Sequence, residues 1–247
     1  AISAGASGAQ ETNRFTEGSV TIRELSVAGY WITNGEKAVL IDALIRNPLG
    51  PGEETLERLE TASPPFDGVD LILVTHSHGD HFDPESVARH LIHNPDAVVV
   101  SGLLVGEQLA ELPESNVFQD RVIVVSPEPG EVLELEANGI PLKVFRVSHG
   151  GPDGDYSLEN LGISADLGTT RIFTTGDIVP AGEAEIFRRA RLDRDSIDFA
   201  FLAFTIFDED FQPDGLAILD ELISPRHIVV AHLYESHYGD FTEDILV

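Results

Sequence analysis

The stretch LILVTHSHGDH occupies residues 71–81 and joins a short apolar run to a cluster of polar side chains. Residues 71–75 have the continuous apolar character of a strand that is buried on both faces. The side chains that follow offer nitrogen and carboxylate donors, which suit Zn²⁺, Mn²⁺ or Fe. These donors are His76, His78, Asp80 and His81. Alternation along a tight loop predicts that His76 and His78 face one ion, and that Asp80 and His81 face a second.

Three further donors, His149, Asp177 and His232, stand directly after apolar runs elsewhere in the chain. Ligand sites of α/β proteins gather at the carboxyl ends of strands, so each donor is placed where a site is expected. Taken singly, each residue could instead cap a strand, occupy a turn or form a hydrogen bond within the core. Together with the first cluster they supply enough donors for two metal ions.

Turn and helix signals divide the chain into two halves of similar order. Asn34-Gly35 and Asn138-Gly139 predict hairpin turns, and Asp83-Pro84 predicts the start of a helix over residues 84–93. We expect His90 and His93 of that helix to lie at the surface. In each half, hairpins come first and helix–strand alternation follows. This order predicts two mixed sheets packed face to face with helices outside, within a single domain over residues 18–247. Residues 1–17 are rich in Ala, Ser and Gly and predict a flexible arm.

The composition is that of a globular protein with an unusual charge. The 247 residues are 42% hydrophobic, which suffices for a sizeable core, and no apolar run approaches the roughly 20 residues of a membrane span. There are 43 Asp and Glu against 15 Lys and Arg, giving a net charge of -28. Such a field repels polyanions, so we expect a small-molecule substrate and no nucleic-acid partner. Both a high-salt habitat and an acidic exported protein fit this surface.

The chain has no cysteine, so a metal site must use His and carboxylates. It begins AISAGASGAQ, which is typical of the sequence that follows a removed export signal, although a trimmed chain would look the same. We therefore expect an exported or periplasmic protein rather than a cytoplasmic one. The sequence leaves the oligomeric state open.

The segment HSHGDH at residues 76–81 resembles the HxHxDH signature of the metallo-β-lactamase superfamily. The later His, Asp and His come in the order and at the spacings of that family, over roughly residues 19–240. The resemblance implies an αββα sandwich and a dinuclear hydrolase in which hydroxide bridges two zinc ions, with Mn²⁺ or Fe as alternatives. Asp42 resembles the structural Asp that precedes the signature.

The resemblance also implies a role for each donor. His76, His78 and His149 would bind the first metal, Asp80, His81 and His232 the second, and Asp177 would bridge them. Asp80 would also orient the nucleophile or receive its proton. The segments HSHGDHFD, Asn160-Leu161-Gly162 and FTTGD at residues 173–177 look most like the ascorbate-6-phosphate lactonase-like branch. Members of that branch usually carry a Gly-His pair in the first hairpin, which residues 25–29 lack.

Some residues outside the donor set are candidates for contact with the substrate. Tyr234 and His237 lie just after His232 and are candidate catalytic residues. Phe207 and Phe211 could wall the pocket and favour an apolar substrate, or could be ordinary core residues.

The leading hypothesis is hydrolysis of a lactone or other ester. A phosphodiesterase or a β-lactam-type amide hydrolase would use the same site. The alternative from another class is a non-catalytic, metal-stabilised binding protein, which the complete donor set argues against.

Overall fold

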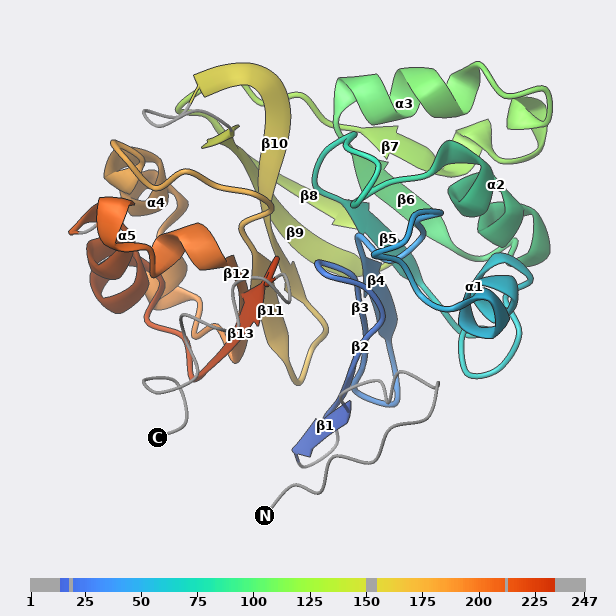
Figure 1. Cartoon of the computed structure of the whole chain (residues 1–247), viewed down its shortest axis with the longest axis horizontal. Coiled ribbons are helices and arrows are strands. Elements are labelled where there is room, and N and C mark those ends of the chain that lie inside the picture. Colours follow the sequence, from blue (N-terminus) through green and yellow to red (C-terminus); the bar gives the residue numbers. More distant parts are fainter. Residues whose placement is uncertain (1–13, 18–19, 150–154, 212, 234–247) are drawn as a thin grey trace.

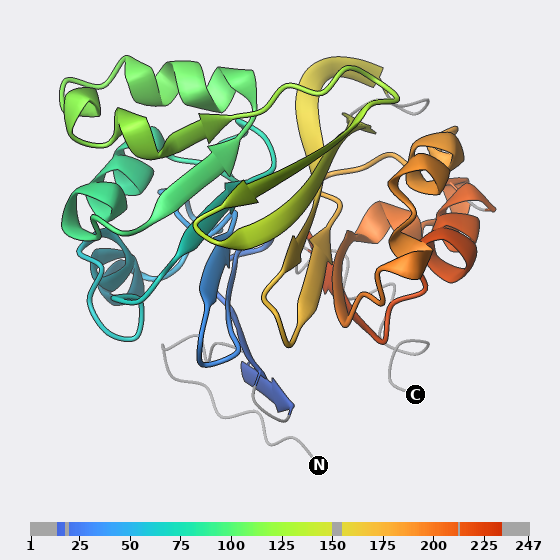
Figure 2. The same ribbon diagram turned by 180° about the vertical axis from the view of Figure 1, so that it is seen from behind.

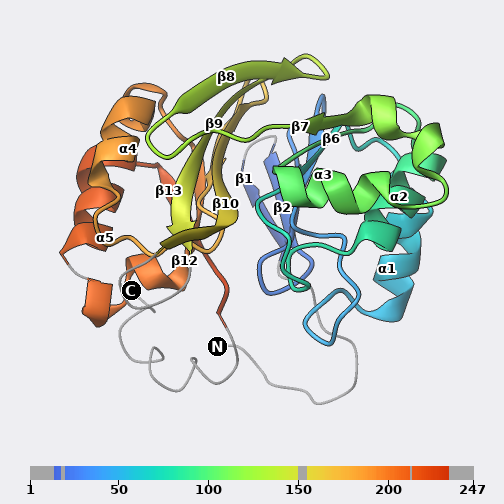
Figure 3. The ribbon, with the colours of Figure 1, turned by 90° about the horizontal axis from the view of Figure 1, so that it is seen from above.

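The computed structural model describes residues 14–17, 20–149, 155–211 and 213–233. These residues form two mixed β-sheets that pack face to face, with helices on the outer surface of each sheet (Figures 1 and 2). Viewed from above, the two helical layers lie on opposite sides of the sheet pair (Figure 3). The predicted αββα sandwich is confirmed.

The first sheet has seven strands in chain order. They are β1 (Arg14–Glu17), β2 (Val20–Glu24), β3 (Tyr30–Thr33), β4 (Ala38–Ile41), β5 (Leu71–Val74), β6 (Val98–Ser101) and β7 (Val122–Val124). The first four strands are antiparallel and the last four are parallel. Parallel neighbours need long crossovers, and the helices α1 (Glu53–Glu60), α2 (Pro84–His93) and α3 (Leu103–Ala110) lie within them.

Strand β1 corrects the expected extent of the N-terminal arm. The prediction took residues 1–17 as an arm, but Arg14–Glu17 pairs with β2 along its whole length. The small residues that suggested an arm lie before position 14, whereas β1 itself is Arg-Phe-Thr-Glu and includes the strand-forming residues Phe15 and Thr16. The rest of the predicted arm, residues 1–13, lies outside the described part of the chain.

The second sheet has six strands in the order β13-β12-β11-β10-β9-β8. They are β8 (Val132–Ala137), β9 (Ile140–His149), β10 (Asp155–Asp166), β11 (Arg171–Thr174), β12 (Phe199–Ala203) and β13 (His227–Ala231). Antiparallel pairing again comes first and parallel pairing follows from β11 onward. The covering helices are α4 (Ala184–Ala190), α5 (Asp214–Ala217) and a π-helical turn at Ile218–Ile223. Short 3₁₀ turns span Ser115–Val117, Gln119–Arg121, Leu192–Arg194, Phe204–Ile206 and Glu209–Phe211.

The hydrophobic core has three layers. Strand β5 lies between two of them, which explains why the sequence of this strand is apolar throughout. Leu71 and Leu73 face the second sheet, whereas Ile72 and Val74 face the helices of the first half. A strand buried on both faces has no position for a polar side chain until it ends. The first polar residues of this segment therefore appear at the carboxyl edge of the sheet.

Helix α2 begins at the predicted residue, but His90, which was expected at the surface, is buried. The side chain of Asp83 accepts a hydrogen bond from Ser86 N at 2.8 Å, which caps the helix. His93 is exposed, but His90 is fully buried and lies 2.6 Å from Leu59 O through its Nδ1. The expectation of a surface His90 is wrong because α1 packs over this face of α2. Burial lowers the pKa of His90 to about 4.

No helix in the described ranges is long and apolar enough to cross a bilayer.

Candidate metal centre

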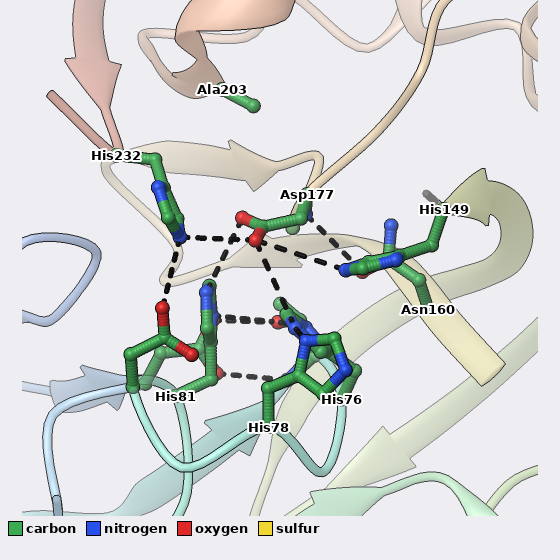
Figure 4. A network of polar contacts seen from close by, with 12 residues as sticks. His76, His78, His81, His149, Asn160, Asp177, Ala203 and His232 are labelled. Atoms are coloured by element: carbon green, nitrogen blue, oxygen red, sulfur yellow. Dashed lines mark hydrogen bonds and ion pairs between the residues drawn. The ribbon is translucent and has the colours of Figure 1, made fainter. Parts of the chain in front are cut away.

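The seven predicted donors meet at one edge of the sandwich, although they come from distant parts of the chain. Residues 76–81 follow β5 in the first sheet, and His149 is the last residue of β9 in the second. Asp177 and His232 follow β11 and β13. Figure 4 shows six of these side chains pointing toward one another, namely His76, His78, His81, His149, Asp177 and His232. Each sheet thus contributes through the carboxyl ends of its strands.

Donor atoms within 4.8 Å of one another define three overlapping groups. They are His76, His78 and His149; Asp80, His81 and His232; and His76, His81 and Asp177. The first two groups contain the same partners as the two ions predicted from the loop alternation. The third group connects them through Asp177.

Asp177 lies at the centre of the cluster. Its Oδ2 is 3.0 Å from His232 Nε2, 3.8 Å from His149 Nε2 and 3.9 Å from His76 Nε2. Its Oδ1 is 3.3 Å from His81 Nε2. One carboxylate therefore faces donors of both outer groups, which is the arrangement that a bridging ligand needs.

A buried carboxylate, Asp42, orients the first donors from behind. Only 2% of Asp42 is exposed, and it accepts hydrogen bonds from Thr75 N at 2.8 Å and Thr75 Oγ1 at 2.6 Å. Its Oδ2 lies 2.9 Å from His81 Nδ1, and Thr75 Oγ1 lies 3.0 Å from His76 Nδ1. Because these contacts use the Nδ1 atoms, the Nε2 atoms of both rings are directed into the cluster.

Asn160 supports Asp177 from the other side, and the sequence argument did not give it this role. It is fully buried on β10, and its Oδ1 accepts a hydrogen bond from Asp177 N at 3.3 Å. Its Nδ2 donates to Thr175 O at 3.4 Å. A Cβ at Gly176 would lie 2.1 Å from Asn160 Oδ1, so only glycine allows this approach. The Asn-Leu-Gly segment was visible in the sequence, but nothing there shows what the amide contacts.

Two residues at the site have left-handed backbone conformations. Asp42 has φ +44° and His232 has φ +64°. Such values are uncommon for residues other than glycine and gather at functional sites. His232 N donates to Val27 O at 2.8 Å, so the hairpin at residues 25–29 holds this donor through its backbone.

Charge in the cluster is distributed unevenly. Burial opposes the charged form of His81, but Asp177 and Asp42 outweigh it and raise its pKa to about 10. Burial also opposes the charged form of His232, but Asp177 and Asp80 raise its pKa to about 9. For His76, burial and then the neighbouring His81 lower the pKa well below its usual value.

The carboxylates respond to the same neighbours. A hydrogen bond from His232 outweighs burial and lowers the pKa of Asp80 well below its usual value. Burial would raise the pKa of Asp177, but His81, His149 and His232 hold it far below the usual range. Both carboxylates are therefore anionic at neutral pH, as ligands must be.

The buried ring nitrogens of the cluster indicate that it can hold divalent cations. His81 Nε2 and His149 Nε2 are buried inside it and face the Asp177 carboxylate at 3.3 and 3.8 Å, but neither makes a well-directed hydrogen bond among the described residues. A buried ring nitrogen without a good hydrogen bond costs stability unless another partner, such as a metal ion, binds it. Imidazole and carboxylate donors in groups of three, with a shared carboxylate, suit zinc and related ions.

Tyr234 and His237 lie outside the described residues. Phe207 packs partly buried against the core cluster beneath α4, and Phe211 is partly buried in a 3₁₀ turn.

Comparison with known sequences identifies the protein family. The profile of the beta-lactamase superfamily domain matches residues 37–233, which include all seven donors. A UPF0173 metal-dependent hydrolase of Thermus thermophilus is 30% identical over 222 residues, covering 86% of this chain and 83% of the relative. One of Pyrococcus furiosus is 29% identical over 218 residues, with 86% and 84% coverage. The chain belongs to the UPF0173 family of metal-dependent hydrolases.

Solved structures share the fold at low sequence identity. A metal-dependent hydrolase from Parabacteroides distasonis has a TM-score of 0.58 at 17% identity, covering 94% of this chain and 92% of that one. An isothiocyanate hydrolase from Delia radicum gut bacteria gives 0.58 at 17% identity, with 90% and 91% coverage. Human tRNase Z, short form, gives 0.55 at 14% identity, with 87% and 88% coverage. Proteins with such different names share this fold, so the fold does not identify the substrate. The resemblance to the ascorbate-6-phosphate lactonase-like branch stays a prediction.

Proposed function

We propose that this metal-dependent hydrolase is dinuclear, uses zinc, and cleaves a lactone or another ester of a small molecule. The observation that carries the proposal is the position of Asp177 between two separate groups of three donors. A mononuclear centre would need one such group and would leave the other unexplained.

The donor groups assign a place to each ion. His76, His78 and His149 would hold one, Asp80, His81 and His232 the other, with Asp177 shared. Two such ions, when bound, lower the pKa of a coordinated water and polarise the carbonyl group of a substrate.

Asp80 is the residue best placed to handle a proton. It is only half-buried, and its Oδ2 lies 3.3 Å from His232 Nε2, which fixes the direction of the carboxylate. As an oriented, ionised carboxylate it can accept the hydrogen bond of an attacking water and then its proton. Asp42 and Asn160 are buried behind the cluster and keep the surrounding donors in place.

The charge of the chain favours an ester over a polyanionic substrate. A net charge of -28 slows the approach of anions at long range and hardly affects neutral molecules. We therefore expect neutral lactones and esters to be better substrates than small phosphodiesters, and nucleic acids to be poor ones. Phosphodiester or β-lactam hydrolysis at the same site is the outcome that would replace this proposal.

The test has two parts. Elemental analysis after gentle purification should find about two zinc ions per chain, and a value that stays at or below one with added Zn²⁺ or Mn²⁺ contradicts the dinuclear centre. The values of kcat/KM should then be compared for a neutral lactone, a small phosphodiester, a β-lactam and single-stranded DNA. His149→Ala should lose metal and activity, whereas His93→Ala, which replaces an exposed histidine outside the cluster, should keep both.

A further inference from the structure

A concavity of about 300 Å³ lies next to the metal cluster, between β10 and α3. Figure 1 shows the curved first part of β10 approaching α3. Its lining includes Leu103, Leu104, Glu107, Arg146, Leu158 and Glu159. None of these side chains belongs to the donor groups or to the residues that orient them.

The concavity exists because β10 bulges beside the position that pairs with a metal donor. Asp155 pairs with His149 and Asn160 pairs with Val147, so residues 156–159 lie opposite the single residue Ser148. A bulge bends its strand, redirects the side chains in it and is common beside active sites. Here it carries Leu158 and Glu159 away from the sheet and toward α3.

The walls are anchored from both ends of the bulge. The Glu159 carboxylate accepts hydrogen bonds from Leu103 N and, at 2.7 Å, from Ser126 Oγ. At the other end, Tyr156 OH donates to Glu183 at 2.7 Å. The shape is therefore formed in advance, which reduces the entropy cost of binding.

Arg146 is the one cationic residue of the described lining, in which Glu107 and Glu159 are acidic, and it has donors to spare. Its guanidinium lies 5.8 Å from the centre of the Tyr156 ring, and its Nη2 donates to Tyr156 O. Within the described ranges it makes no ion pair, although the chain has 43 acidic residues, and its buried Nε has no hydrogen-bond partner. An arginine fork with unused donors is suited to an oxygen acceptor.

Leucines supply the apolar side. Leu103 is 50% exposed and Leu104 is 43% exposed on the first turn of α3, and Leu158 lies opposite them. Neighbouring exposed leucines that line a concavity indicate a binding surface, because isolated ones would be scattered. An aliphatic group placed here would cover them.

We propose that this concavity is a substrate subsite for a short aliphatic chain that ends in a carbonyl or carboxylate oxygen. Arg146 binds the oxygen and the leucines cover the chain. Leu103 and Ser126 follow the carboxyl ends of β6 and β7, as His76 follows that of the neighbouring strand β5, so one substrate can span both places. The inference rests on the proposed function, since it treats the concavity as holding the part of the substrate that does not react.

The test measures binding without hydrolysis, so its failure is distinct from failure of the proposed function. Zinc-loaded protein is titrated with hexanamide, hexanoate and hexylamine while backbone amide signals are followed by NMR. Hexanamide should shift the Leu103, Leu104 and Leu158 amides in a saturable way, and hexylamine should not. Arg146→Gln should weaken hexanamide binding about fivefold, as expected for one lost hydrogen bond.

Matched variants keep the result interpretable. Leu104→Ser changes an exposed side chain, should fold normally, and should also weaken binding. Arg194→Gln and Leu216→Ser, at exposed positions elsewhere, should leave it unchanged. Equal binding of hexylamine, or unchanged binding in both Arg146→Gln and Leu104→Ser, would overturn the proposal. Hexanoate shifts confined to residues 76–81 and unaffected by Arg146→Gln would exclude a carboxylate as the acceptor.

Discussion

Replacing Asp42 by Asn should weaken metal binding although Asp42 contacts no metal. In the native protein the carboxylate accepts from Thr75 N, from Thr75 Oγ1 and from His81 Nδ1. Because Thr75 Oγ1 donates to Asp42, the same oxygen can accept from His76 Nδ1. One acceptor-only side chain therefore sets the proton positions of two histidines, leaving each Nε2 free to bind metal.

An asparagine cannot reproduce this pattern in either orientation. If its Nδ2 replaces Oδ2, the amide faces the Nδ1–H of His81, and a change of tautomer would place a proton on the coordinating Nε2. If its Nδ2 replaces Oδ1, the amide faces Thr75 N–H in a fully buried position. A hydrogen bond to a charged group is worth about 1.5–3 kcal/mol, which corresponds to roughly a 10- to 100-fold loss of metal affinity.

The assay is zinc affinity by chelator competition, together with the zinc content after dialysis. Asp70→Asn is the matched control, because Asp70 accepts from Lys37 Nζ at 2.9 Å and Ala38 N at 2.8 Å and touches none of the seven donors. That variant should lose stability and keep its zinc affinity. Unchanged affinity for two ions in Asp42→Asn would refute the reasoning.

Three other outcomes are expected. Asp80→Asn should lower kcat by about 10²- to 10⁴-fold without changing the circular dichroism spectrum, and near-parental turnover would show that Asp80 handles no proton. With a net charge of -28, the melting temperature should rise as NaCl increases from millimolar to molar; a flat curve would argue against strong self-repulsion and a high-salt habitat. The unfolded chain binds a proton at His90 below about pH 6.5, whereas the folded chain does so only near pH 4. The free energy of unfolding from urea titrations should therefore fall by about 3 kcal/mol as the pH is lowered from 6.5 to 4, and it should fall more gently in His90→Gln. Equal slopes for the two proteins would exclude this linkage.

The sequence was sufficient for the features that depend on local patterns. The continuous apolar run at residues 71–74 marked strand β5, and the Asn-Gly pairs at residues 34–35 and 138–139 do join β3 to β4 and β8 to β9. Donors at strand ends were also visible, because strand direction alone brings such ends to one edge of a sheet.

Features that depend on tertiary contacts were not visible. The burial of His90 follows from the packing of α1 against α2, and the role of Asn160 follows from a turn 15 residues further along the chain. The bulge at residues 156–159 has no turn residues to reveal it, since its shape comes from anchors on α3 and beside α4. Long-range contacts of this kind leave no periodic signal in a single sequence.

The chain crosses from one sheet to the other only between β7 and β8, within the described residues. A cut in that connection would divide the protein into two fragments, each with a whole sheet and its own helices. Four donors would remain on the first fragment and three on the second. Neither fragment could hold a complete pair of ions, so metal would act as the reversible cross-link that rejoins them. Zinc-dependent fragment complementation would then report on the assembly of the centre without any substrate.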